Sequence, residues 1–287
     1  MSFEETMATL MRLAAGTDAL GAVAAHASLI LQGNEIEPSL AKAFGEVEAA
    51  VGISGIEALA PPQLAVVAGM PRMFIREADI QTSDPGRPPA WNYTDPVVLE
   101  SYGRGSAMMP QLISSSVAEA AEVTSFLDVG VGVGWLAIAA AQHWPGARVV
   151  GIDVWAPSLE RARAHVAESG VEDRVELREQ DAGELDDVDA YDCAWLPSFF
   201  FDGDELAAVT RRVVRATRPG GVVVLGRFDP SPNALDQATS NLRAVRSGGC
   251  MVSPVEAAEL LQAAGCATVR AVPRTWPMPI QFVVGVR

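Results

Sequence analysis

The chain has 287 residues, of which 49% are apolar and 20% are charged, as in a globular protein with a sizeable core. Its net charge of −15 repels phosphate backbones, so we expect no nucleic-acid partner. Three irregularly spaced cysteines exclude a disulfide framework, and the lack of a long apolar run or a basic N-terminus leads us to expect a cytoplasmic protein outside the membrane.

The first part of the chain, residues 1–90, is expected to form a helical domain rich in Ala and Leu. Apolar residues at helical spacing predict two helices that are separated at Gly16–Asp18, where a glycine precedes an N-capping aspartate. Two more helices are predicted, at Pro38–Val51 and from Pro61 onward. The turn-rich residues 81–92 are expected to link this domain to the next.

Residues 91–287 are predicted to form the second domain. One or two helices are expected over Asp95–Val123, after which strands and helices alternate. The predicted segments, in chain order, are strand Ser125–Val129, helix Gly134–Gln142, strand Ala147–Ile152, helix Ser158–Ser169, strand Val175–Glu179, strand Ala190–Leu196, helix Asp204–Thr217, strand Val222–Gly226, helix Pro254–Ala264, strand Thr268–Val272 and strand Gln281–Val286. This alternation predicts an α/β fold with a Rossmann-like, seven-stranded sheet. Eight residues between the last two strands are too few for a helical crossover, so the last strand should run antiparallel.

The segment FLDVGVGVGWL, residues 126–136, is the main indication of a ligand-binding site in the sequence. A buried strand ends in Asp128, and Gly130, Gly132 and Gly134 then lead into a helix. Glycines let the backbone turn tightly and let a ligand approach its N–H groups, while the helix N-terminus favours a negative group. Asp153 stands at the end of the next strand, 19 residues after Gly134, where an acid accepts hydrogen bonds from two ribose hydroxyls.

Two cofactors compete for this loop, a nicotinamide dinucleotide and S-adenosylmethionine. The dinucleotide pattern G-x-G-x-x-G fails when read from Gly130, but read from Gly132 it ends at Ala137, which is tolerated. Asp128 favours S-adenosylmethionine, because an acid two residues before the first glycine repels a pyrophosphate and attracts the methionine ammonium group.

With these residues, DVGVGVG followed by VVGID, the chain resembles the class I S-adenosylmethionine-dependent methyltransferases, of the bacterial natural-product type. Three further segments match in the order of the family: residues 178–182 (REQDA), 191–197 (YDCAWLP) and 218–221 (RPGG). The resemblance covers about residues 95–287. It implies S-adenosylmethionine as the cofactor, methyl transfer to a small-molecule acceptor as the activity, and a homodimer paired through the helical domain.

The motif and the resemblance imply two sets of site residues. The expected cofactor-binding residues are Asp128, Gly130, Gly132, Gly134, Asp153, Val154, Trp155, Asp181, Ala182, Tyr102, Arg104 and Trp195. The expected substrate-binding residues are Phe199, Phe200, Trp91, Tyr93 and Arg246. In these sets Asp181 meets the adenine amine, Tyr102 or Arg104 bonds the methionine carboxylate, and the phenylalanines form an apolar substrate wall.

No residue is assigned as a catalytic base, and no metal site is expected. His143 and His165 are predicted to lie on the far side of the sheet from the cofactor, and His26 reaches a pocket only if the first helices cover it. The leading hypothesis is methyl transfer to an oxygen, nitrogen or carbon atom of a secondary metabolite. A rearrangement or cyclisation on the same cofactor site, or an NAD-dependent oxidation, stays open as an alternative.

Overall fold

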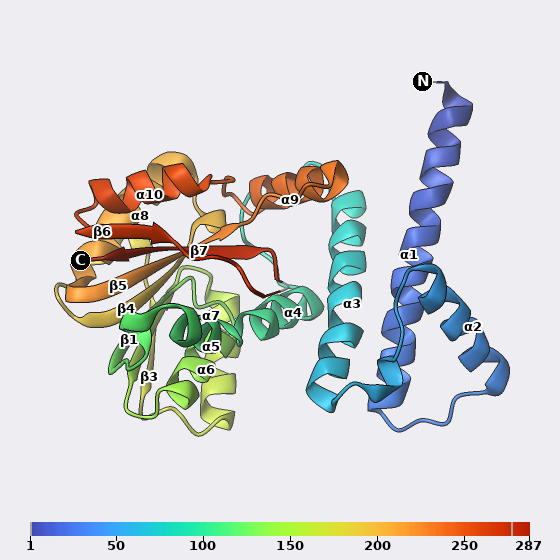
Figure 1. Ribbon diagram of the computed structural model, residues 1–287, viewed down its shortest axis with the longest axis horizontal. Helices are drawn as coiled ribbons and strands as arrows, with labels where there is room; N and C mark the ends of the chain where they lie inside the picture. The colour runs from blue at the N-terminus through green and yellow to red at the C-terminus, as the bar shows by residue number, and fades with distance from the viewer. Residues whose placement is uncertain (1, 277) are drawn as a thin grey trace. The chain divides into compact units, whose positions relative to one another are not determined.

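The computed structural model describes residues 2–276 and 278–287, and the chain divides into two units (Figure 1). One unit comprises Met1–Arg87 with Asp95–Ser101, and the other comprises Pro88–Thr94 with Tyr102–Arg287. The helices and strands, in chain order, are α1 (Phe3–Leu31), α2 (Pro38–Ala50), α3 (Pro61–Ser83), α4 (Pro96–Ser106), α5 (Met109–Ser116), β1 (Ser125–Val129), α6 (Trp135–His143), β2 (Arg148–Asp153), α7 (Ala156–Glu168), β3 (Val175–Glu179), β4 (Tyr191–Pro197), α8 (Gly203–Ala216), β5 (Thr217–Phe228), α9 (Ala234–Arg246), α10 (Pro254–Ala263), β6 (Thr268–Ala271) and β7 (Ile280–Val286).

The second unit is built on one seven-stranded sheet with the strand order β3-β2-β1-β4-β5-β7-β6. Strands β1 to β5 pair in parallel, whereas β7 runs antiparallel to both of its neighbours, β5 and β6. The predicted α/β fold with an antiparallel last strand is therefore confirmed. The carboxyl ends of β1, β2, β4 and β5 lie along one edge of this sheet, which is where ligands bind in open α/β folds.

The central strands are buried on both faces, which explains their nearly continuous apolar sequences. On β4, Cys193 and Trp195 face the layer that contains α5, α6 and α7, while Ala194 and Leu196 face α8 and α10. Figure 1 shows these two helical layers on opposite faces of the sheet. The sheet and its helices hold the ends of the central strands in a fixed arrangement.

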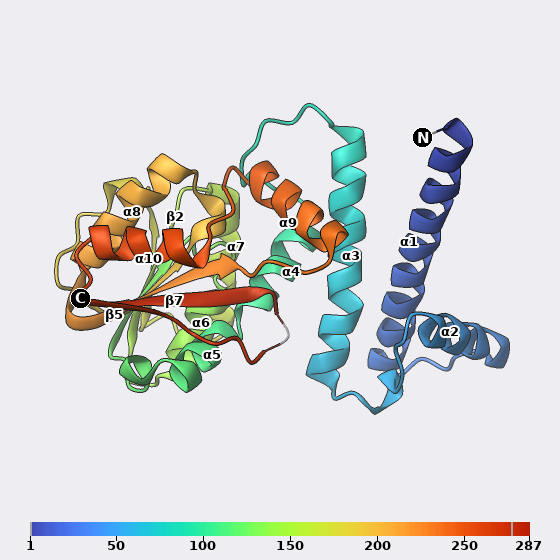
Figure 2. The same ribbon diagram turned by 45° about the horizontal axis from the view of Figure 1, so that its top comes forward.

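The predicted helix break at Gly16–Asp18 is wrong, because α1 runs unbroken through these residues. The Thr17 hydroxyl donates to the Leu13 carbonyl 3.2 Å away, so the threonine is satisfied inside the helix. A helical glycine costs only about 1 kcal/mol relative to alanine. Figures 1 and 2 show α1 and α3 side by side in opposite directions, with α2 beside α1. Their small core is formed by Val23, Ala27, Ile56, Leu64 and Ala68.

Helix α9 was not predicted from the sequence, although its start carries a recognisable capping residue. The Asn233 side chain accepts hydrogen bonds from the backbone N–H groups of Leu235 and Asp236. Such a cap is a typical helix start, and it is the signal that would have found this helix. The helix ends at Arg246.

Helix α1 is long and apolar enough to cross a membrane, with a mean hydropathy of 1.3 over its most apolar stretch. Only 22% of that stretch is buried inside the structure. Length and composition alone are weak evidence for a membrane span, since core helices of soluble proteins pass the same test.

Substitution of Gly226 by alanine is expected to destabilise the second unit. An added Cβ would stand 2.1 Å from the Trp195 ring, so the tightly packed layer would have to shift, at a cost of about 1–3 kcal/mol in the free energy of unfolding. Urea unfolding measures this. The control is Gly146→Ala, whose Cβ meets nothing within 4 Å and which should change stability by less than about 0.5 kcal/mol. Equal stability of the two variants would contradict this account.

Candidate functional site

The loop after β1 has the backbone that its three glycines allow. Gly130, Gly132 and Gly134 have φ values of 71°, 54° and 86°, in the left-handed region that strains other residues. A Cβ on Gly134 would also lie 3.1 Å from the Ala162 side chain, so the loop packs closely against α7. The glycines therefore hold the turn between β1 and α6 close to the end of β2.

The Asp153 carboxylate, at the end of β2, is fixed against this loop. One oxygen accepts from the Gly132 N–H at 2.8 Å, and the other accepts from the Trp155 N–H at 2.8 Å. The backbone N–H groups of Gly130 and Val131 both donate to the Ile152 carbonyl. The ends of β1 and β2 thus form one rigid corner with an acid on each strand.

This corner holds two acids and has no cation to balance them within the described chain. Asp128 is 1% exposed, and its Oδ2 is buried without a hydrogen-bond partner. Burial, together with the charge of Asp153, raises the pKa of Asp128 well above its ordinary value. Burial also raises the pKa of Asp153, against the hydrogen bonds from the backbone. A cationic group bound here would relieve both acids, which fits the ammonium and sulfonium groups of S-adenosylmethionine and does not fit a pyrophosphate.

The end of α4 packs on the start of α6 and brings a cation beside the loop. A Cβ on Gly103 would stand 2.3 Å from Val133, so α4 approaches the loop as closely as a glycine permits. The Arg104 guanidinium lies 4.6 Å over the Trp135 ring, and no ion pair holds it within the described residues. Arg104 thus lies beside the N-terminus of α6. The guanidinium and this helix N-terminus together favour an anionic group such as the methionine carboxylate.

The remaining residues expected at the adenosine end lie around the ends of β2 and β3. Val154 is 62% exposed directly after Asp153, and the Trp155 indole N–H donates to the Tyr93 carbonyl at 2.8 Å. Asp181 accepts from the Gly183 N–H and caps a short helix that begins at the buried Ala182. Their contacts with adenine and ribose stay predictions.

Six aromatic side chains meet at the carboxyl ends of β4 and β5, and we call them the aromatic cluster. They are Trp91, Tyr93, Tyr102, Phe199, Phe200 and Phe228. Trp91 lies at the centre, with ring centroids of Tyr102 and Phe200 both 4.9 Å away. Sequence reasoning missed Phe228, which stacks on Phe199 at 4.5 Å; its place at the end of β5 was the available signal.

Trp195 and Arg227, which lie on neighbouring strands, are both buried by contacts within the chain. Trp195, expected to bind the cofactor, is 4% exposed and packs against Gly226 and Phe282 in the core layer. Its side chain points to one face of the sheet because strand residues alternate. The Arg227 guanidinium is buried and donates to the Val252 carbonyl and to Gln281.

All three histidines have partners. His143 meets the Ser114 hydroxyl at 2.7 Å, and His165 meets the Val133 carbonyl at 2.9 Å. His26 and Glu48 are buried together, with Nδ1 and Oε1 2.5 Å apart, and Glu57 lies close by. Two ligands of one tetrahedral zinc ion stand about 3.4 Å apart, so the His26–Glu48 contact is a direct hydrogen bond.

Substitution of Asp128 by asparagine is expected to stabilise the ligand-free protein at neutral pH. The pKa of Asp128 is higher in the folded protein than its unfolded value of 3.8. The folded protein therefore has its full stability below pH 3.8 and loses part of it as the pH rises through the folded-state pKa of Asp128. Asparagine has no charged form, so its burial carries no such loss of stability at neutral pH. We therefore expect the midpoint of thermal unfolding at pH 7 to rise by at least about 2 °C. The gain should shrink toward pH 4.

The matched control for that experiment is Asp192→Asn. Burial alone would raise the pKa of Asp192, but hydrogen bonds from Thr124 and the charge of Arg218 lower it overall. Its stabilising effect is therefore present at neutral pH and lost in acid, so Asp192→Asn should lower the midpoint at pH 7. A destabilised Asp128→Asn protein at pH 7 would show that the buried acid is balanced in some other way.

Comparison with known proteins finds similarity over the part of the chain that carries the glycine loop and the strand-end acids. Residues 126–221 match the family model described as a methyltransferase domain. Similar curated proteins include 27-O-demethylrifamycin SV methyltransferase of Amycolatopsis mediterranei, 34% identical over 125 residues, and methyltransferase GfsG of Streptomyces halstedii, 35% identical over 132 residues. Each match covers 42% of this chain and 46% of the relative, so the chain spans less than half the length of these relatives.

Solved structures are similar over nearly the whole chain. Mitomycin 7-O-methyltransferase MmcR has a TM-score of 0.68 at 22% identity, over 99% of this chain and 98% of its own. Human N-acetylserotonin methyltransferase in complex with SAM has a TM-score of 0.60 at 16% identity, over 100% and 99%. At these identities the likeness shows a shared fold, which includes the helical unit.

The glycine loop, the two strand-end acids and the matched domain agree with one another. They agree with the resemblance drawn from the sequence motifs and with the predicted cofactor. Residues 126–221 therefore carry a methyltransferase domain, and S-adenosylmethionine is the cofactor that the glycine loop and this domain indicate.

Proposed function

We propose that the protein transfers a methyl group from S-adenosylmethionine to a hydroxyl oxygen of a small natural-product molecule. The observation that carries the proposal is the buried acid pair, Asp128 and Asp153, which lacks a cation beside a loop shaped by glycines. The relatives named for rifamycin and mitomycin methylation support an acceptor of the natural-product class.

Several groups of the chain would hold the cofactor in this proposal. Asp128 would balance the positive charge of the cofactor, and Asp153 would accept hydrogen bonds from its ribose hydroxyls. Arg104 would bind the methionine carboxylate. When bound, S-adenosylmethionine supplies an electrophilic methyl group on a sulfonium sulfur. The chain contributes a fixed, partly dehydrated corner that orients its ligand, and such positioning is a large part of the rate enhancement of a displacement reaction.

The aromatic cluster is the proposed acceptor side of the same site. Its rings border the carboxyl ends of β4 and β5, beside the acids at the ends of β1 and β2. Flat apolar rings bind conjugated molecules and keep water from the reacting atoms. A cytoplasmic location belongs to this proposal, and the three free cysteines accord with a reducing compartment.

A rearrangement or cyclisation with the same cofactor is the second candidate. It is favoured by the histidines, which are all hydrogen-bonded within the chain and so are not set free as a general base. The mass of the product separates the candidates, since only methyl transfer adds one methylene unit.

Calorimetry is expected to show S-adenosylmethionine binding to the wild-type protein, and Asp153→Ala is expected to weaken it by at least about tenfold, because ribose hydroxyls lose a charged acceptor. The control is Asp204→Ala, an exposed acid on α8. The proposal fails if the wild-type protein does not bind the cofactor, or if the two variants bind it equally well.

We further propose that the helical domain, residues 1–90, pairs two copies of the chain, while residues 91–287 carry the reaction. One face of α1 presents large apolar side chains near its start, where Phe3, Met7 and Leu10 are 78%, 39% and 51% exposed. The same face continues at helical spacing with the small residues Gly21 and Ala24.

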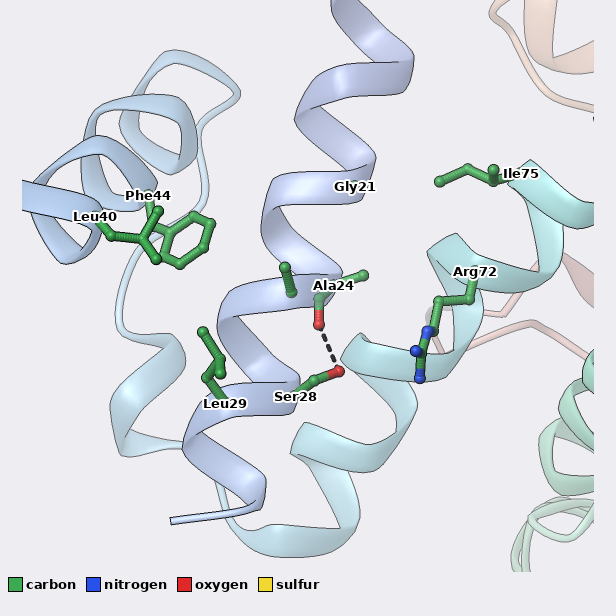
Figure 3. A pocket seen from close by; sticks show the side chains of 9 residues that line it. Gly21, Ala24, Ser28, Leu29, Leu40, Phe44, Arg72 and Ile75 are labelled. Atoms are coloured by element: carbon green, nitrogen blue, oxygen red, sulfur yellow. Dashed lines mark hydrogen bonds between the residues drawn. The ribbon is translucent and has the colours of Figure 1, made fainter. Parts of the chain in front are cut away.

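These small residues form the floor of a hollow of about 540 Å³ in the helical unit. Figure 3 shows α1 between the two sides of this hollow, which are lined by Leu40 and Phe44 of α2 on one side and by Arg72 and Ile75 of α3 on the other. A hollow of this form accepts the large side chains of another helix.

A second copy of α1, lying antiparallel, supplies such side chains. Phe3 then falls opposite Ser28, Met7 opposite Ala24 and Leu10 opposite Gly21. Each of these pairs has its midpoint between Ala15 and Gly16, so one twofold axis at that point satisfies all of them. A twofold interface must be self-complementary, which is what a helix with large residues at one end and small residues at the other provides.

Substitution of Leu10 by glutamate is expected to convert the dimer into a monomer, because the charge would enter the apolar hollow of the second copy. Light scattering at micromolar concentration measures the mass. Val255→Glu, on an exposed position of α10, should leave the dimer intact. A monomeric wild-type protein, or a dimeric Leu10→Glu variant, would refute the proposed pairing.

A further inference from the structure

Arg246, the last residue of α9, carries a guanidinium group that the described chain leaves without a partner. Its Nε is buried and has no hydrogen-bond acceptor, and no ion pair holds the side chain among the described residues. Several other arginines of this acidic protein are held in ion pairs, as Arg218 is with Asp192. A buried donor without an acceptor costs about 1–3 kcal/mol, so this group favours any ligand that brings one.

The backbone of Arg246 is tied to the segment that carries Trp91. Its carbonyl accepts a hydrogen bond from the Ala90 N–H at 3.0 Å. After it, Gly249 packs so closely that an added Cβ would stand 2.2 Å from the Phe199 carbonyl. The turn after α9 thus lies between the segment before Trp91 and the start of the Phe199–Phe200 pair, against the aromatic cluster.

The helix terminus explains only part of this arrangement. A cation near the C-terminus of a helix is favoured by the helix dipole, which accounts for a basic residue in the last turn. Arg243, in the same turn, meets that preference on α9 and has interactions of its own. The helix dipole leaves the buried Nε of Arg246 without an acceptor, whereas an anionic ligand would supply one.

We infer that Arg246 binds the carboxylate of the acceptor, so that the substrate class is aromatic acids that also carry a hydroxyl group. This inference rests on the proposed function, because it concerns the acceptor side of the same site. A guanidinium binds a carboxylate through two parallel hydrogen bonds, and partial burial of the group strengthens the attraction. One guanidinium balances one negative charge on a ligand. The net charge of −15 on the chain disfavours ligands that carry more.

Paired ligands test this inference directly. Hydroxylated aryl carboxylates, such as para-hydroxycinnamate and para-hydroxybenzoate, are compared with their methyl esters, which keep the ring and remove the charge. Binding is measured by tryptophan fluorescence on the full chain, saturated with S-adenosylhomocysteine. We expect at least one acid to bind the wild-type protein about tenfold more tightly than its ester, as for one charge-assisted interaction.

The variants are Arg246→Gln and Arg246→Lys, with Arg211→Gln on the exposed surface of α8 as the control. Arg246→Gln should abolish the preference for the acid while ester binding changes by less than about twofold, and Arg246→Lys should keep part of the preference. Arg211→Gln should bind both ligands as the wild-type protein does. Cofactor binding should be unchanged in all three variants.

The inference is overturned if no acid binds the wild-type protein more tightly than its ester, or if Arg246→Gln keeps the preference. Loss of acid and ester binding together in both Arg246 variants would show a structural role for this arginine and also overturn it. These failures leave cofactor binding and the mass gain of the product intact, whereas failure of the proposed function removes one or both of them.

Discussion

Two carboxylates stand at neighbouring strand ends in a part of the sheet that water hardly reaches. Desolvation disfavours the charged form of Asp128, and the nearby Asp153 adds to that effect. The fold keeps this unfavourable pair because the glycine loop, the end of β2 and the end of α4 converge on it. A site that is strained without its ligand and relieved by a positive charge selects a cationic cofactor, and the rest of the site is arranged around that choice.

The segment Pro88–Thr94 connects the cofactor side with the acceptor side. At one end the Trp155 indole, next to the ribose acid, donates to the Tyr93 carbonyl, and at the other end Ala90 donates to the carbonyl of Arg246. Trp91 lies between these two hydrogen bonds and touches Phe200. One short stretch of backbone therefore joins both halves of the proposed reaction site.

The helical unit and the sheet unit differ in how completely they bury their apolar side chains. In the sheet, helices on both faces bury almost every central strand residue. In the helical unit the core is small, and the first half of α1 leaves large apolar side chains exposed. Exposed apolar residues on one helix face are typical of an interaction surface, which is why we propose that this unit pairs two copies of the chain.

The sequence by itself determined the α/β alternation, the antiparallel last strand and the cofactor, because periodicity, glycine spacing and strand-end acids are local signals. It did not reveal the continuity of α1 through Gly16, since a weak local break is outweighed by an otherwise satisfied helix. Only the tertiary structure decided that Trp195 packs in the core while Phe228 joins Phe199. Those outcomes depend on which face of the sheet each side chain takes and on which strands become neighbours. The unpaired guanidinium of Arg246 likewise became visible only when every nearby partner had been placed.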